Sequence, residues 1–310
     1  MDGAVTVVVG SPKSEAKGGP ATKTTELRLS MHITSSYRAQ EGPGTLRVLA
    51  SVLCAMVFCV GSVATAQVAV RQKEGLVHGF LVLRTLEGET IADGDLIQNA
   101  HGDRVTSRFI FHFKDGSIHD ETAIFSQRGH FRLVSDHLIQ KGPAFKHPME
   151  MTVNVSTGQV SVRYTDEGKE KTANERLQLP PDIANGLLLT LLKNLRPDTP
   201  ETKVAFVAAT PKPRLVKLVI TPHGEESFST GDAHRKAMHF VVRAEIGGLS
   251  GVFAELLGKE PPDTHVWILE GEAPAFVKSE GALALGGPVW RIELVSPVWS
   301  GASTLKAREK

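Results

Sequence analysis

The stretch RFIFHFKDGSIHDETAIFS, residues 108–126, decides the fold class because apolar and polar residues alternate on both sides of a turn signal. Every second residue of RFIFHF is a phenylalanine, which marks one face of a strand as the side toward the core. Asp115-Gly116 is a strong signal for a tight turn between antiparallel strands. The stretch therefore predicts a β-hairpin with an apolar inner face and a polar outer face.

The same hairpin raises the question of a metal site. If Asp115-Gly116 forms a two-residue turn, His112 faces His119 across the strands and Glu121 lies diagonal to His112. Two imidazoles and a carboxylate could bind a transition metal, which would imply a metal-dependent hydrolase. A one-residue bulge would instead move His119 to the opposite face. Because exposed strand faces are polar by default, we favour a hairpin without a site, and no catalytic, cofactor or metal-binding residue is predicted.

The chain after Gly79 repeats this pattern of alternation interrupted by turn residues, as antiparallel β-proteins do. Residues 183–195 carry leucines at helical spacing and predict a core helix, and LSGVFAELL at residues 249–257 predicts a second, shorter one. The predicted fold class is all-β and mostly antiparallel, with strongly curved sheets or an open β-barrel and two short packed helices. We expect residues 67–200 and 201–300 to be two β-rich halves of one continuous sheet system, each with one helix, followed by a tail at residues 301–310.

The N-terminal part of the chain has the pattern of an export signal. Arg47 precedes an apolar run from Val48 to Val63, and an Ala-Thr-Ala site ends at Ala66. This predicts a secretory signal peptide that is cleaved between Ala66 and Gln67, leaving no stable transmembrane segment. The alternative is an uncleaved N-terminal anchor, although the run is short for a membrane span.

The segment before that signal is unusual. Residues 1–30 are rich in Gly, Ser, Thr and Pro, so we expect either a disordered leader or a misassigned start, with Met31 as the alternative to Met1. Residues 31–66 then form the signal peptide. The expected location of the mature protein is periplasmic or secreted.

Composition excludes several function classes. Of 35 basic and 34 acidic residues, six and four lie in residues 1–66, so the mature chain has 29 and 30 and no charge excess to recruit nucleic acid. Both cysteines, Cys54 and Cys59, lie in the signal segment, which excludes disulfides, thiol catalysis and cysteine-ligated metals from the mature protein.

The sequence also contains none of the common catalytic or nucleotide-binding motifs. The chain lacks G-x-S-x-G, H-E-x-x-H, a phosphate-binding loop and G-x-G-x-x-G. Asp120-Glu121 and Glu225-Glu226 are adjacent on strands and point to opposite faces, so neither pair makes a two-carboxylate site. The remaining histidines have no ligand spacing, and the aromatic residues of the last strands are expected to be core anchors, namely Trp267, Phe276 and Trp290.

The segment LLGKEPPDTHVWILEGEAPAFVKSEGALALGGPVWRIEL, residues 256–294, resembles a family of uncharacterised exported bacterial β-proteins. Its members share a GK-x-PPD-x-x-VWI segment, a P-x-FV strand and a closing GGP-x-WRI strand. FHFKDGSIHDET and VNVSTGQVSVRY upstream extend the resemblance, whose layout is loosely similar to the DUF3108 proteins. The resemblance implies a fold and no activity, cofactor or site residue.

These observations favour a non-enzymatic exported protein. A curved sheet with a helix across its mouth has room for an apolar cavity, which predicts binding of an apolar small molecule or lipid, or of a cell-envelope protein. The alternatives are the metal-dependent hydrolase and a structural or interaction protein whose solid core leaves no cavity.

Overall fold

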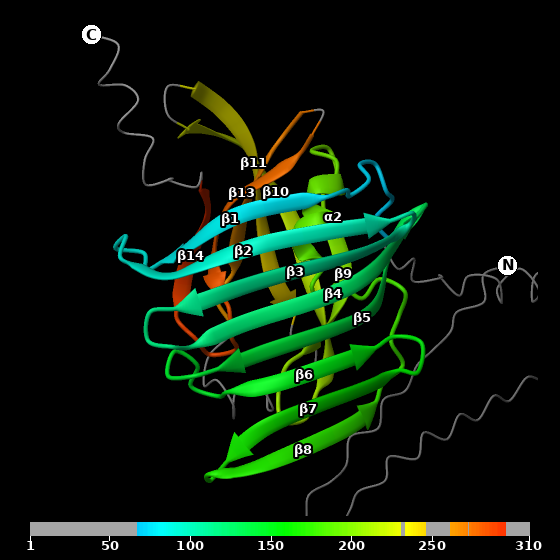
Figure 1. Ribbon diagram of the computed structural model, residues 1–310. Helices are drawn as coiled ribbons and strands as arrows, with labels where there is room; N and C mark the ends of the chain where they lie inside the picture. Colours follow the sequence, from blue (N-terminus) through cyan, green and yellow to red (C-terminus); the bar gives the residue numbers. More distant parts are fainter. Residues whose placement is uncertain (1–66, 231–232, 246–260, 272, 296–310) are drawn as a thin grey trace, which may run out of the picture. The chain divides into compact units, whose positions relative to one another are not determined.

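The computed structural model describes residues 67–230, 233–245, 261–271 and 273–295. They form one antiparallel sheet and one short helix (Figure 1). The first eight strands are β1 Val77–Arg84, β2 Thr90–His101, β3 Arg104–Phe113, β4 Ile118–Arg128, β5 His130–Lys141, β6 Met149–Asn154, β7 Gln159–Asp166 and β8 Lys169–Arg176. The helix α2 Leu188–Asn194 is followed by β9 Thr202–Ala208, β10 Arg214–Thr230, β11 Ala233–Glu245, β12 Thr264–Leu269, β13 Ala275–Ala282 and β14 Val289–Val295.

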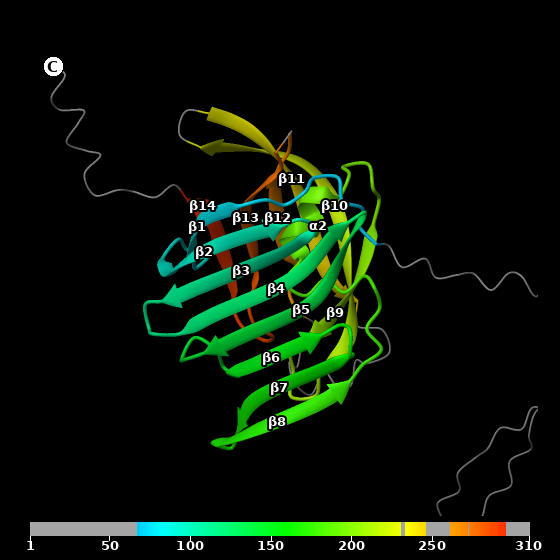
Figure 2. The ribbon, with the colours of Figure 1, turned by 45° about the vertical axis from the view of Figure 1, so that its right-hand side comes forward.

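The sheet has fourteen strands in the order β8-β7-β6-β5-β4-β3-β2-β1-β14-β13-β12-β11-β10-β9. Each half of the chain is a meander, and the halves join where β1 pairs with β14, for example Leu83 with Ile292. The two edges of the sheet, β8 and β9, are therefore consecutive in the sequence. Figures 1 and 2 show the sheet curling so that β1–β8 form one broad wall and β9–β14 lie behind it, with α2 in between. The predicted fold class is confirmed.

One face of this sheet builds the core. Inward residues alternate along each strand, and the largest fully buried side chains include Phe111, Phe125, Phe240, Leu83 and Met151. Leu187, Leu191 and Leu192 belong to the same cluster, so α2 is buried against the inner face of the sheet. A single apolar core thus spans both halves of the chain.

The connection between the edge strands differs from the predicted helix over residues 183–195. Only Leu188–Asn194 is helical, because the residues before it pair with the free edge of β9. Ile183 forms a parallel bridge with Ala205, and the Asn185 side chain bonds both the N–H and the C=O of Val207 at 2.8 and 3.0 Å. These bonds satisfy backbone groups of an edge strand, which would otherwise be left unpaired in the core.

The other edge of the sheet, strand β8, carries many charged side chains. Strand β8 has the sequence KEKTANER, and most of its side chains are exposed. Charged side chains on an edge strand oppose pairing with another chain. The second predicted helix, over residues 249–257, lies outside the described residues, as do the signal segment up to Ala66 and the tail; Gln67 is the first residue that is described.

The decisive hairpin is present, but its predicted register is wrong. The turn is a three-residue loop, Lys114-Asp115-Gly116, closed by a bond from the N–H of Phe113 to the C=O of Ser117 at 2.9 Å. Gly116 takes a φ of +83°, the left-handed conformation required at the third position of such a loop. The extra residue shifts the pairing by one position, so His112 faces Ile118 instead of His119.

Candidate functional site

A cleft with a volume of about 260 Å³ lies on the inner side of the sheet, beside the C-terminal end of α2. Its apolar lining comes from three elements. Leu192 and Leu195 belong to α2 and its cap, Met238 and Phe240 to β11, and Ile268 to β12. The cleft therefore opens where the helix end leaves the inner face of the sheet.

Charged groups ring this cleft. Lys193 Nζ lies 2.7 Å from Glu74 Oε2, and both side chains are almost completely buried, 11% and 6% exposed. Gln127 holds the backbone of Glu74 in place by accepting from its N–H at 2.7 Å and donating to its C=O at 3.1 Å. On the far side lies Glu270, whose pKa is raised by burial and by the negative charge of Glu225.

The segment before β1 completes the rim. Asn194 Oδ1 accepts the backbone N–H groups of Arg71 and Gln72 at 2.9 and 2.7 Å. The Arg71 guanidinium donates to the C=O of Leu195 at 3.0 Å, one of the carbonyls left unpaired at the end of the helix. The cleft is thus held by hydrogen bonds between residues more than a hundred positions apart in the sequence.

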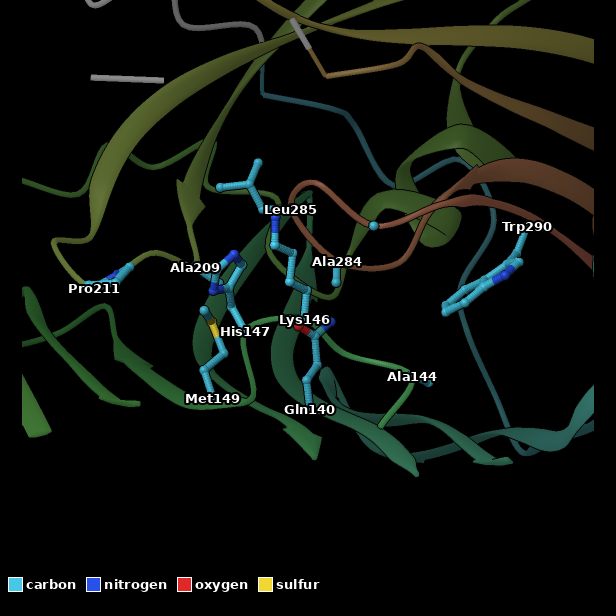
Figure 3. A pocket seen from close by; sticks show the side chains of 11 residues that line it. Gln140, Ala144, Lys146, His147, Met149, Ala209, Pro211, Ala284, Leu285 and Trp290 are labelled. Carbon is cyan, nitrogen blue, oxygen red and sulfur yellow. The ribbon is translucent and has the colours of Figure 1, made fainter. Parts of the chain in front are cut away.

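A second pocket lies at the opposite end of the strands and is far smaller, about 40 Å³. Figure 3 shows its lining side chains, most of which come from the β5–β6, β9–β10 and β13–β14 connections, with Lys146 and His147 among them. Gln140, in β5, donates to the C=O of Leu283 at 2.7 Å and so ties β5 to the β13–β14 connection. This space suits about one water molecule and no larger ligand.

Two acids lie inside the core, on neighbouring strands. Glu121 of β4 and Asp136 of β5 both face inward, where the turn at Gly186 covers them. Burial raises the pKa of Glu121 to about 7, although it accepts the backbone N–H of Gly186. Burial and the nearby charge of Glu121 raise the pKa of Asp136 well above its ordinary value, and no other described side chain forms a hydrogen bond with either carboxyl oxygen of Asp136. Both carboxyl groups therefore keep their protons to a higher pH than they would in water.

His119 also lies inside, among aromatic rings. It is 3% exposed, its Nδ1 lies 3.2 Å from Gln140 Nε2, and its ring contacts Phe109, Phe111 and Phe145 edge-on or tilted. Burial lowers its pKa to about 4, so the imidazole is neutral at physiological pH.

The alternative metal site is therefore not assembled. His112 is exposed on the outer face, whereas His119 and Glu121 point inward, because the three-residue loop reverses their orientation relative to His112. Nowhere in the described part of the chain do three or more His, Asp or Glu side chains converge as metal ligands would. The hypothesis of a metal-dependent hydrolase required these three side chains to converge, and in the structure they do not.

A cluster of aromatic rings that residue spacing did not predict lies on the outer face of β10–β12. His239 stacks on Trp267 with ring centroids 4.5 Å apart and planes 4° apart, and His223 and His265 lie on either side. Of the three expected core anchors, Phe276 and Trp290 are in the core, but Trp267 packs outside it. The histidines come from separate strands, so only the strand pairing brings them together. An apolar-polar alternation in AMHFVV was the one available signal that His239 faces outward.

Comparisons with known proteins add the following. No protein-family model matches the sequence, and no curated protein does. Among solved structures, a β-barrel-like protein of the domain of unknown function DUF1849 from Brucella abortus is similar, with 10% identity, a TM-score of 0.42, and coverage of 74% of this chain and 100% of that one. The hypothetical lipoprotein YmcC from Escherichia coli K12 is similar at 9% identity and a TM-score of 0.31, covering 84% and 100%. Both are bacterial proteins without an assigned function, and the resemblance to the DUF3108 layout stays a prediction.

Among the residues that the structure describes, no helix combines the length and the apolar character needed to cross a bilayer.

Proposed function

We propose that this chain is a non-enzymatic binding protein of the bacterial cell envelope, periplasmic or secreted, that holds an apolar small molecule in the cleft beside α2. The observation that carries the proposal is the cleft itself: apolar side chains of α2, β11 and β12 line it together with Arg71, Lys193 and Glu270, and Lys193 is neutralised by Glu74. Concave apolar sites with a few polar groups at the edge are typical of small-molecule binding.

The volume restricts the ligand. About 260 Å³ lies just below the usual range of ligand pockets, so the site suits a short acyl chain or a single ring system whose remainder extends into solvent. The rim charges of Lys193 and Glu74 neutralise each other at 2.7 Å. A ligand with an uncharged or zwitterionic polar end fits such a balanced rim better than a strongly charged one.

Two further observations support binding over catalysis and an exported location. Neither pocket is lined by Glu121, Asp136 or His119, the groups whose pKa values depart furthest from ordinary values. The export proposal rests on the sequence alone, through the apolar run that ends in Ala-Thr-Ala before Gln67.

The test is to express the full chain in a bacterial host, recover it from the periplasm and the medium, and record its native mass spectrum. Cleavage before Gln67 and a co-purifying mass of lipid or small-metabolite size are the expected results. The delipidated protein should then bind an apolar fluorescent probe such as N-phenylnaphthylamine at one site.

A matched pair of variants locates that site. Leu195→Glu places a charge in the cleft and should weaken probe binding at least tenfold, since burying an unpaired carboxylate is costly. Leu86→Glu makes the same change at an exposed leucine, 45% accessible, and should leave binding unchanged. A bare polypeptide mass together with no probe binding would favour the structural alternative, and an intact leader would contradict the proposed export.

A further inference from the structure

The outer face of β10–β12 contains two histidines that share a hydrogen bond. His239 Nε2 and His265 Nδ1 are 2.9 Å apart. On its other side, His239 Nδ1 lies 2.9 Å from Glu226 Oε1, and the Trp267 indole donates to Glu226 Oε2 at 2.7 Å. His239 is only 9% exposed although it lies on the outer face, because the neighbouring rings cover it.

The proton positions follow from these contacts. A carboxylate can only accept, so His239 Nδ1 carries a proton. In the neutral ring Nε2 is then an acceptor, and the proton of the shared bond belongs to His265 Nδ1. A first additional proton can enter at His265 Nε2 without disturbing this bond. A second must enter at His239 Nε2, where it would face the N–H of His265 across 2.9 Å.

The charges around His239 act in both directions. Glu226 of β10 favours its protonation, whereas His223 of β10 and His265 of β12 oppose it once they are charged. Lys278 of β13 lies over the indole of Trp267, with its Nζ 3.8 Å from the ring centroid. Burial is the largest influence and lowers the pKa of His239.

Other charged groups near this face are already paired. Asp263, which precedes β12, forms two hydrogen bonds with Arg243 at 3.1 and 2.8 Å. Glu280 of β13 lies between Arg291 and Lys278 at 2.9 and 3.5 Å. These pairs leave Glu226 as the carboxylate that contacts His239 directly.

We propose that the His239–His265 pair is an acid-operated switch, in which a second proton at His239 Nε2 breaks the shared bond, separates the rings and rearranges the outer face over β10, β11 and β12. Together, the two protons add two positive charges to this face, the second of them with the rearrangement. It also alters the stack on Trp267, so the state of the switch is reported by a tryptophan. This inference is independent of the ligand cleft, which lies on the inner face.

Nuclear magnetic resonance of the ¹⁵N-histidine- and ¹⁵N-tryptophan-labelled protein tests the switch. Long-range ¹H–¹⁵N spectra of the imidazoles are recorded between pH 8 and pH 4.5, with His239 and His265 assigned through His239→Gln and His265→Ala. We expect the two rings to titrate in two separate steps, with the Trp267 indole N–H shifting in the second step. In His265→Ala, His239 should take up its proton about one pH unit higher, because its charged neighbour is gone.

His137 provides the control, since it bonds a single carboxylate, Glu150, at 2.9 Å on another part of the sheet. Its titration should not respond to His265→Ala. Titration of His239 and His265 in one step at one pH in the unmodified protein would overturn the switch. The switch would also be overturned if His239 titrated at the same pH in the folded His265→Ala variant as in the unmodified protein.

Discussion

Glu121 and Asp136 lie on the neighbouring strands β4 and β5 and face inward beneath the turn at Gly186, with Asp136 buried and Glu121 half-buried. Two acids packed together without a basic partner hold their protons more tightly than they do in water, which is why both pKa values are raised. The folded protein therefore binds more protons than the unfolded chain between about pH 4.5 and 7, and this contribution to stability is lost as the pH rises through that window.

Asp136→Asn should raise the unfolding free energy relative to the unmodified protein, and it should do so more at pH 8 than at pH 5. The amide has the shape of the protonated acid and never ionises, so the variant avoids the cost of ionising a buried carboxyl group, and that cost grows as the pH rises. Denaturant unfolding of both proteins at the two pH values measures the difference. A difference in unfolding free energy that is the same at pH 5 and pH 8 would contradict the prediction.

His119 titrates in the opposite sense. Its pKa is lowered to about 4, so the folded protein binds fewer protons than the unfolded chain, and stability is lost as the pH falls from 6.5 through 4. His119→Gln cannot ionise, so its unfolding free energy relative to the unmodified protein should rise by about 3 kcal/mol between pH 7.5 and pH 4. His112→Gln, at an exposed position on the adjacent strand, is the control and should show no such trend.

The hairpin shows what sequence can and cannot predict. Alternation correctly predicted the strands and the face that carries Phe111 and Phe113. Asp-Gly, however, is compatible both with a two-residue loop and with a three-residue loop that ends in a left-handed glycine. Asp115 accepts the N–H of Ser117 at 2.8 Å and favours the longer loop, a local side-chain contact that decided which face His119 took.

The proximity of the buried acids, and that of the outer histidines, could not be predicted from the sequence for a related reason. Glu121 and Asp136 become neighbours only through the pairing of β4 with β5, which contains a register shift at Ile124. The pairing of β10 with β11 shifts in the same way beside His223. Each of these two pairings contains an irregularity, so residue spacing along one strand does not reveal which side chains lie side by side.

Gly186→Ala should destabilise the protein far more than a change of backbone preference alone. Gly186 has a φ of +62°, and an added Cβ would lie 2.5 Å from Ala123 Cβ and 3.0 Å from Asp136 Oδ1. The left-handed conformation costs about 1–2 kcal/mol and the crowding about 1–3 kcal/mol more. Gly102→Ala is the matched control, because Gly102 has the same φ of +62° with nothing within 4 Å of its added Cβ. Equal losses of unfolding free energy in the two variants would contradict the prediction, since they would show that the turn at Gly186 shifts to accommodate the added Cβ without crowding Asp136.

The ion pair between Lys193 and Glu74 joins α2 to the segment before β1 and is buried on both sides. Lys193→Met leaves the Glu74 carboxylate buried without its cation, and we expect a loss of about 3–5 kcal/mol in unfolding free energy. The double variant Lys193→Met with Glu74→Gln should recover most of that loss, because the uncharged amide needs no counter-ion and both backbone bonds to Gln127 remain. Denaturant unfolding of the four proteins in this double-mutant cycle gives the coupling free energy. Additive losses would mean that Glu74 finds water or another partner when Lys193 is removed, and that the rim of the cleft does not depend on the pair.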